Sequence, residues 1–108
     1  MDVISSFQTD KGADAVYQIG EEISFSFTLA QAGYVELEIK EPGRDPYVLQ
    51  YPYERMQAGE HVLPDPASPY LFELNEPTGQ HSVTLRYQNE SARPSVTDSA
   101  IVTFEIVR

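Results

Sequence analysis

Apolar and polar side chains alternate along several short segments of this chain. The clearest segment is 23–29, in which Ile23, Phe25, Phe27 and Leu29 are separated by Ser or Thr. Successive side chains of a β-strand point to opposite faces, so this alternation predicts strands that bury one face. An amphipathic helix needs an apolar repeat of about 3.6 residues, and no segment sustains one. The chain is therefore predicted to be all-β.

The same alternation predicts strands elsewhere, with Gly and Pro residues between them where turns are needed. The expected strands are 2–8, 23–29, 34–40, 47–51, 60–63, 70–74, 82–88 and 100–107. A single helical turn at 53–57 is the only helix expected. Parallel sheets have continuous apolar runs, so alternating strands favour antiparallel pairing. We predict an antiparallel Ig-like β-sandwich of about seven to eight short strands, forming one domain over residues 1–108.

Prolines concentrate in the middle of the chain. Seven of the eight lie between Pro42 and Pro77. Proline has no N–H to donate to a strand ladder, so it belongs at sheet edges and in loops. We expect this stretch to form an edge region with long connections.

Composition excludes several classes of function. The chain has 7 basic and 17 acidic residues, for a net charge of −10. This charge disfavours binding to nucleic acid and to anionic lipid, and mutual repulsion favours a monomer. The absence of Cys excludes thiol chemistry and disulfides. No apolar run is long enough to span a membrane, and no signal-peptide pattern follows Met1. We therefore expect neither a membrane-spanning segment nor a signal peptide in this chain.

The histidines do not suggest an enzyme. His61 and His81 are the only two, and no Ser lies in a Gly-x-Ser-x-Gly elbow. Together with Glu60 and Asp65 they lack the spacing of a zinc site. We expect both to face solvent or to have satisfied hydrogen bonds, with His81 in a turn before a strand.

One pair of carboxylates has a spacing compatible with catalysis. Glu36 and Glu38 share a strand face, as the two acids of an inverting glycosidase could. That face must be polar to meet water, however, and a small domain offers little room for a polysaccharide. We expect no catalytic residues and no cofactor.

Acidic loops form a hypothetical calcium site. Calcium needs several oxygen ligands that converge at one place. Asp10, Asp14, Glu41 and Asp45 could do so if their loops meet at one end of the sandwich, with Asp98 as a further candidate. The alternative is an acidic surface that only confers solubility.

A row of aromatic residues forms a second candidate surface. Tyr47, Leu49, Tyr51 and Tyr53 share one parity, so a strand here would carry them on one face. Exposed tyrosines could stack on sugar rings or grip a peptide, since they give rigid amphipathic contact area. The alternative is that this face closes the open side of the core.

Three local patterns resemble a known family. They are Tyr-Gln-Ile-Gly-Glu at 17–21, Ala-Gly-Tyr-Val-Glu-Leu at 32–37, and Met-Gln-Ala-Gly-Glu at 56–60 followed by Glu-Pro-Thr-Gly at 76–79. Their order resembles the bacterial domain of unknown function 4384 family. The resemblance implies an Ig-like β-domain attached to larger bacterial, often cell-envelope, proteins. The family has no assigned activity.

These observations favour a non-enzymatic accessory Ig-like module of a bacterial envelope or secreted protein. It would act in protein interaction or as a spacer, with the segment 47–53 as the contact surface for an unidentified protein partner. The alternative is a ligand-binding module, for carbohydrate at the tyrosines or for calcium at the acidic loops. Only the resemblance bears on location.

Overall fold

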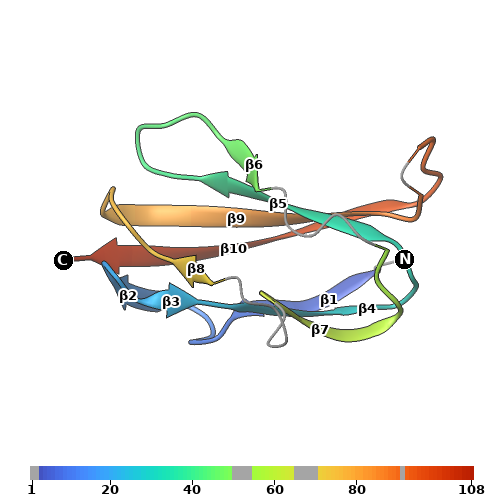
Figure 1. Cartoon of the computed structure of the whole chain (residues 1–108), viewed down its shortest axis with the longest axis horizontal. Coiled ribbons are helices and arrows are strands. Elements are labelled where there is room, and N and C mark those ends of the chain that lie inside the picture. The colour runs from blue at the N-terminus through green and yellow to red at the C-terminus, as the bar shows by residue number, and fades with distance from the viewer. Residues whose placement is uncertain (1–2, 50–54, 65–70, 91) are drawn as a thin grey trace.

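The computed structural model describes residues 3–49, 55–64, 71–90 and 92–108. These residues form ten strands and no helix (Figure 1). The strands are β1 (Ile4–Thr9), β2 (Ala15–Gln18), β3 (Glu22–Ile23), β4 (Phe25–Leu29), β5 (Tyr34–Lys40), β6 (Tyr47–Leu49), β7 (Gly59–Leu63), β8 (Phe72–Glu73), β9 (Gly79–Gln88) and β10 (Thr97–Val107).

The strands assemble into three sheets. One has five strands in the order β2-β10-β9-β5-β6, one has three in the order β1-β4-β7, and β3 pairs with β8. Figure 1 shows β5, β6, β9 and β10 in one layer, facing β1, β3, β4 and β7 in the other. All pairings are antiparallel except that of β2 with β10. The prediction of an all-β chain with antiparallel sheets is confirmed.

The core lies between the layers and consists of the residues that the alternation selected. In β4, Phe25, Phe27 and Leu29 are buried while the intervening Ser and Thr are not. In the facing layer, Leu37 of β5 pairs in register with Leu85 of β9, and both are fully buried. Each such side chain contributes about 1.5–3 kcal/mol by leaving water. The buried apolar residues are Val3, Ile4, Ala15, Tyr17, Ile23, Phe25, Phe27, Leu29, Val35, Leu37, Leu63, Val83, Leu85, Tyr87, Phe104 and Ile106.

Three details of the predicted strands differ from the structure. The expected strand 23–29 is divided into β3 and β4, because its start pairs with β8 and the rest pairs with β1 and β7. Strand β2 was not predicted, and it lies parallel to β10. The described part of the expected helical turn is not helical: Met56 instead forms an antiparallel bridge with Gly33.

The proline-rich middle of the chain forms edges, as predicted. Strand β6 is the last strand of the five-stranded sheet, and β7 is the last of the three-stranded sheet. Strand β8 has only two residues and pairs with β3 alone. Because these strands are short and peripheral, the side of the molecule that they border is closed less completely than the centre.

Asp98 ties the first strand to the last. Its Oδ2 accepts hydrogen bonds from the backbone N–H groups of Val3 and Ile4, both at 2.9 Å, and its Oδ1 accepts one from the N–H of Ser99. These donors favour the ionised carboxylate and lower the pKa of Asp98, with the N–H of Ile4 making the largest contribution. Asp98 thus links β1 in one layer to β10 in the other.

Gly33 allows a close approach of the chain to a buried aromatic ring. The Tyr87 hydroxyl donates to the carbonyl of Ala32 at 2.7 Å, which brings the ring against Gly33. A Cβ on Gly33 would lie 2.4 Å from Cε2 of Tyr87 and 2.7 Å from the carbonyl oxygen of Gln88. Only glycine fits this position without moving the ring or the strand.

We therefore expect Gly33→Ala to lower the free energy of unfolding by about 1–3 kcal/mol, as overpacking of a core does. Urea denaturation followed by circular dichroism measures the change. Gly43→Ala is the control, because a Cβ there would meet no heavy atom within 4 Å. Its left-handed backbone would cost an alanine roughly 1–2 kcal/mol, so the loss in Gly33→Ala should be the larger of the two. Equal losses in the two variants would contradict the role given to Gly33.

We also expect acid to weaken the link through Asp98. The folded-state pKa lies below the unfolded value of about 3.9, so the contribution is complete above that pH and is lost as the pH falls through the folded-state pKa. Asp98→Asn should lower the free energy of unfolding at neutral pH by about 1–3 kcal/mol. Its difference from the wild type should shrink below about pH 4. The same change at exposed Asp45 is the control, and a pH-independent difference for Asp98→Asn would contradict this account.

Candidate binding cleft

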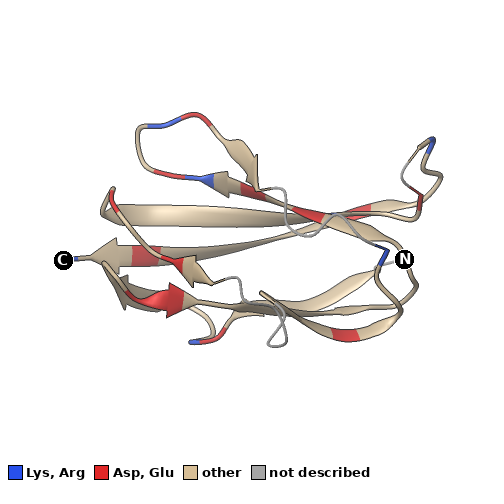
Figure 2. Cartoon of the chain, viewed as in Figure 1, with Lys and Arg blue, Asp and Glu red and all other residues tan. Residues whose placement is uncertain are grey.

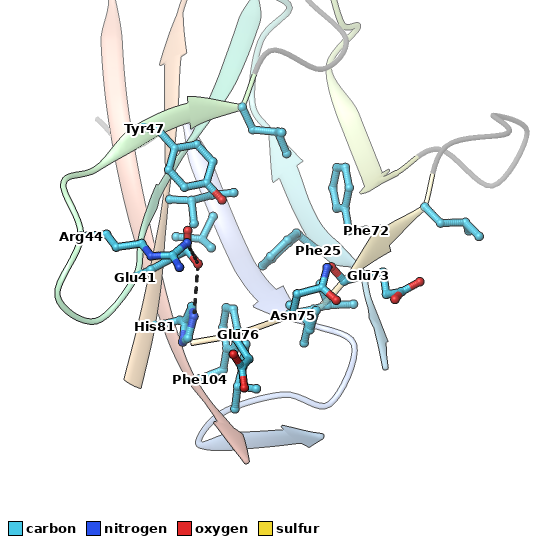
Figure 3. A pocket seen from close by; sticks show the side chains of 17 residues that line it. Phe25, Glu41, Arg44, Tyr47, Phe72, Glu73, Asn75, Glu76, His81 and Phe104 are labelled. Carbon is cyan, nitrogen blue, oxygen red and sulfur yellow. Dashed lines mark hydrogen bonds and ion pairs between the residues drawn. The ribbon is translucent and has the colours of Figure 1, made fainter. Parts of the chain in front are cut away.

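A cleft of about 410 Å³ opens between the two layers on the side bordered by β6 and β8 (Figure 3). Ligand sites in proteins have volumes of roughly 300–1,000 Å³. Among the described residues, β6 pairs only with β5 and β8 only with β3, so no ladder joins the layers here. The lining residues are Ile23, Phe25, Ile39, Glu41, Arg44, Tyr47, Leu49, Leu71, Phe72, Glu73, Leu74, Asn75, Glu76, His81, Val83, Phe104 and Ile106.

His81 is the most unusual side chain of the cleft. It lies in β9, is 3% exposed, and stacks on the ring of Phe104 at a centroid distance of 5.6 Å. Its Nδ1 donates to the carbonyl of Gly79 at 3.1 Å, since a carbonyl oxygen can only accept. Its Nε2 is buried without a hydrogen-bond partner among the described residues. A buried polar atom without a partner costs about 1–3 kcal/mol.

Glu41 stands opposite this nitrogen. Its Oε2 lies 3.9 Å from Nε2 of His81 and 3.8 Å from the Arg44 guanidinium. Both distances exceed the length of a hydrogen bond. Figure 3 shows Glu41, Arg44 and Tyr47 on one wall of the cleft, with His81 beneath them. Partial burial and the nearby Glu41 carboxylate raise the pKa of the Tyr47 hydroxyl.

The other wall and the floor are mostly apolar. Phe25 and Phe72 lie with ring centroids 6.3 Å apart, and Phe104 forms part of the floor beside His81. The acidic side chains of Glu73 and Glu76 project from β8 and the connection that follows it. The cleft therefore combines an apolar interior, a pair of hydrogen-bond acceptors and a negatively charged rim.

Sequence reasoning placed His81 in a turn with its hydrogen bonds satisfied or in solvent, and that was wrong. The strand begins at Gly79, two residues before His81, and the side chain points inward. The alternation of the strand could have indicated that His81 is buried, because His81 lies on the same face as Val83, Leu85 and Tyr87. His61 does fit the expectation: its Nε2 hydrogen-bonds to the carbonyl of Gln57 at 2.6 Å.

The predicted tyrosine surface is only partly within the described residues. Tyr47 is 46% exposed and lies at the mouth of the cleft, and Leu49 also lines it. Tyr51 and Tyr53 lie outside the described residues. The structure thus joins the first half of the predicted surface to a cavity that the sequence did not suggest.

The candidate calcium ligands are not brought together. Glu41 belongs to the cleft, Asp10 accepts hydrogen bonds from the Tyr17 hydroxyl at 2.6 Å and from the N–H of Ser24, and Asp98 holds β1. The β9–β10 connection lies at the opposite end of the molecule from the 41–46 connection (Figure 1). Neither Asp14 nor Asp45 joins a cluster: the described residues contain no group of three or more His, Asp or Glu side chains able to hold a metal.

Asp10 is held by a buried tyrosine. The Tyr17 side chain is fully buried, and its hydroxyl donates to the Asp10 carboxylate. Burial and this hydrogen bond raise the pKa of Tyr17 to about 12. The carboxylate offered for calcium therefore anchors β2 to the end of β1.

Of the two carboxylates on β5, Glu36 and Glu38, one forms an ion pair among the described residues. Glu38 forms an ion pair with Arg86 of β9 at 3.0 Å. Glu36 lies opposite Arg86 in the strand register. The pair lies on the polar face of the sheet, away from the core, as the alternation of β5 requires.

Comparison with family models assigns the chain. A model described as Domain of unknown function (DUF4384) matches residues 16–87, which are two thirds of the chain. The chain belongs to this family. The DUF4384 segment contains Glu41, Tyr47 and His81, whereas β1 and β10 lie outside it. No curated protein matches the chain. No helix among the described residues could span a membrane.

We expect His81→Phe to raise the free energy of unfolding by about 1 kcal/mol. Phenylalanine keeps the stacking on Phe104 and removes the unpartnered nitrogen, whose burial costs about 1–3 kcal/mol. This gain should exceed the loss of the Nδ1 hydrogen bond to Gly79, which is worth about 1 kcal/mol. His61→Phe is the matched control and should not stabilise the domain, because it removes the bond to Gln57. Thermal and urea denaturation measure both changes. A loss of stability in His81→Phe would mean that Nε2 is satisfied in solution.

Proposed function

We propose that this domain is a non-enzymatic interaction module with an Ig-like β-sandwich fold, and that it holds part of a partner protein in the cleft beside β6. The observation that carries the proposal is the buried Nε2 of His81, which has no hydrogen-bond partner among the described residues and lies in a cleft lined by both apolar and charged side chains. A spacer has no use for such an atom, whereas a binding site can satisfy it when the ligand arrives. The resemblance still predicts a larger bacterial envelope or secreted protein as its setting.

The strand order supports the Ig-like assignment. In Ig domains, strands A, B and E share one sheet, while G, F, C and C′ share the other. Strands β1, β4 and β7 follow the first order, and β10, β9, β5 and β6 follow the second. Under this assignment β6 takes the place of C′, a peripheral strand of the larger sheet, and the cleft lies on the side of that strand.

The surface around the cleft supports protein binding. Tyr47 offers a half-exposed aromatic ring at the mouth, Leu71 is largely exposed, and the interior below is apolar. Exposed aromatic side chains beside a hollow are typical of the anchors in protein interfaces. The exposure of Tyr47 also favours carbohydrate as a second candidate, through stacking of a sugar ring.

Selection from a random-peptide display library against the 108-residue chain tests the proposal. Enriched peptides should shift the backbone amide NMR signals of cleft residues. Tyr47→Ser should weaken these peptides by about fivefold or more, as loss of an aromatic anchor does. Val62→Ser on β7 is the matched control, since Val62 is 41% exposed and does not line the cleft.

Shifts confined to other faces, or no enrichment at all, would overturn the proposal. Cleft shifts produced by glycan fragments and not by peptides would favour the carbohydrate candidate instead. An equal change in affinity for Tyr47→Ser and Val62→Ser would show that the peptides do not bind in the cleft.

A further inference from the structure

The cleft presents two hydrogen-bond acceptors to the same point. Because Nδ1 of His81 donates to the carbonyl of Gly79, Nε2 carries a lone pair whenever the imidazole holds a single proton. The carboxylate of Glu41 accepts hydrogen bonds when ionised. Nε2 and Oε2 are 3.9 Å apart, and each side chain is largely buried. Among the described residues, the Tyr47 hydroxyl contacts Glu41, but no donor reaches Nε2 of His81.

The distance specifies the kind of donor. A nitrogen placed about 2.8 Å from each acceptor would form two hydrogen bonds at an angle of roughly 90°. One atom must therefore carry at least two hydrogens, as an ammonium, a primary amide or a water molecule does; of these, only the ammonium also carries the positive charge that complements Glu41. A primary ammonium has three such hydrogens on a compact head. The guanidinium of arginine is a planar fork suited to side-by-side acceptors, so it matches this geometry less well.

The surroundings suit a positive head on an apolar stem. Phe25, Phe72 and Phe104 line the cleft and can contact methylene groups or stabilise a cation through their ring faces. Glu73 adds negative charge at the rim, Glu76 forms an ion pair with Arg108, and the whole chain carries a net charge of −10. Figure 2 shows acidic residues on β3, β8 and β10 at this end of the molecule.

Two other occupants fit the cleft less well. A metal ion would need more ligands, and the described residues hold no group of three that could bind one. The protein's own Arg44 stands 3.8 Å from Glu41, beyond hydrogen-bonding distance, and its side chain is 61% exposed. Arg44 therefore does not supply a donor to Nε2 of His81.

We propose that the cleft receives a lysine side chain of the partner protein, with its ammonium between Oε2 of Glu41 and Nε2 of His81. This inference rests on the proposed function and gives the chemistry of the partner. The lysine stem would lie along the apolar walls, and the ammonium would donate to both acceptors. Binding would then depend on the positive charge as well as on the apolar contact.

The test uses three capped tripeptides that differ at the central residue: lysine, norleucine and Nζ-acetyllysine. Dissociation constants come from amide NMR shifts of the 108-residue chain. The lysine peptide should bind about tenfold more tightly than the other two, as charge-assisted hydrogen bonds imply. In Glu41→Gln and in His81→Phe, this preference should fall to about twofold or less.

Two controls match these variants in chemistry but not in position. Glu60→Gln removes one negative charge on exposed β7, and His61→Phe removes the other histidine. Both should keep the full lysine preference. Because Glu41→Gln is isosteric, it tests the inference even where His81→Phe alters the packing around Phe104.

The outcomes separate this inference from the proposed function. Equal binding of lysine and norleucine peptides, with shifts in the cleft, would overturn the lysine inference and leave the interaction module standing. A lysine preference that survives in Glu41→Gln and His81→Phe would also overturn it, since the ammonium would lie elsewhere. If neither these peptides nor the display-selected peptides shift cleft residues, both proposals fail.

Discussion

The whole structure depends on the burial of one apolar face per strand between two layers. Phe27 and Leu29 of β4 cannot leave water unless a second sheet supplies residues such as Leu37 and Leu85 on the opposite side. Because the chain has no Cys, the contact between the layers must provide the stability that disulfides add in many small domains. Asp98 and the Tyr17–Asp10 hydrogen bond connect strands that the sheet ladders alone leave apart.

The cleft lies where the two layers bury each other's apolar faces least completely. Strands β6 and β8 are short, and prolines limit how far this part of the chain can extend a ladder. The inward-facing side chains near them are therefore only partly covered. A wholly apolar lining would be a packing defect, but the His81–Glu41 pair adds specific chemistry to it. Replacing the pair with apolar residues would suit stability better, which is why its presence points to binding.

Most of the fold could be predicted because period-two alternation depends on neighbours in sequence. Ile23 to Leu29 and Tyr34 to Lys40 reveal their buried faces without any knowledge of their partners. Strand β2 escaped prediction because it is four residues long and its pairing with β10 joins parts of the chain far apart. Of the cleft residues, Tyr47, Leu49 and Glu41 were singled out in advance, but for separate surfaces and separate roles.

The all-β class, the buried faces of the main strands and the peripheral position of the proline-rich middle can all be predicted from the amino-acid sequence. These properties depend on residue type and local spacing. Only the tertiary structure, through the pairing of β5 with β9, brings Glu41 and His81, forty residues apart in the chain, to within 3.9 Å of each other in the cleft. That juxtaposition depends on strand order and on where the edge strands end. Neither is encoded in any local pattern, because each results from packing the two layers together.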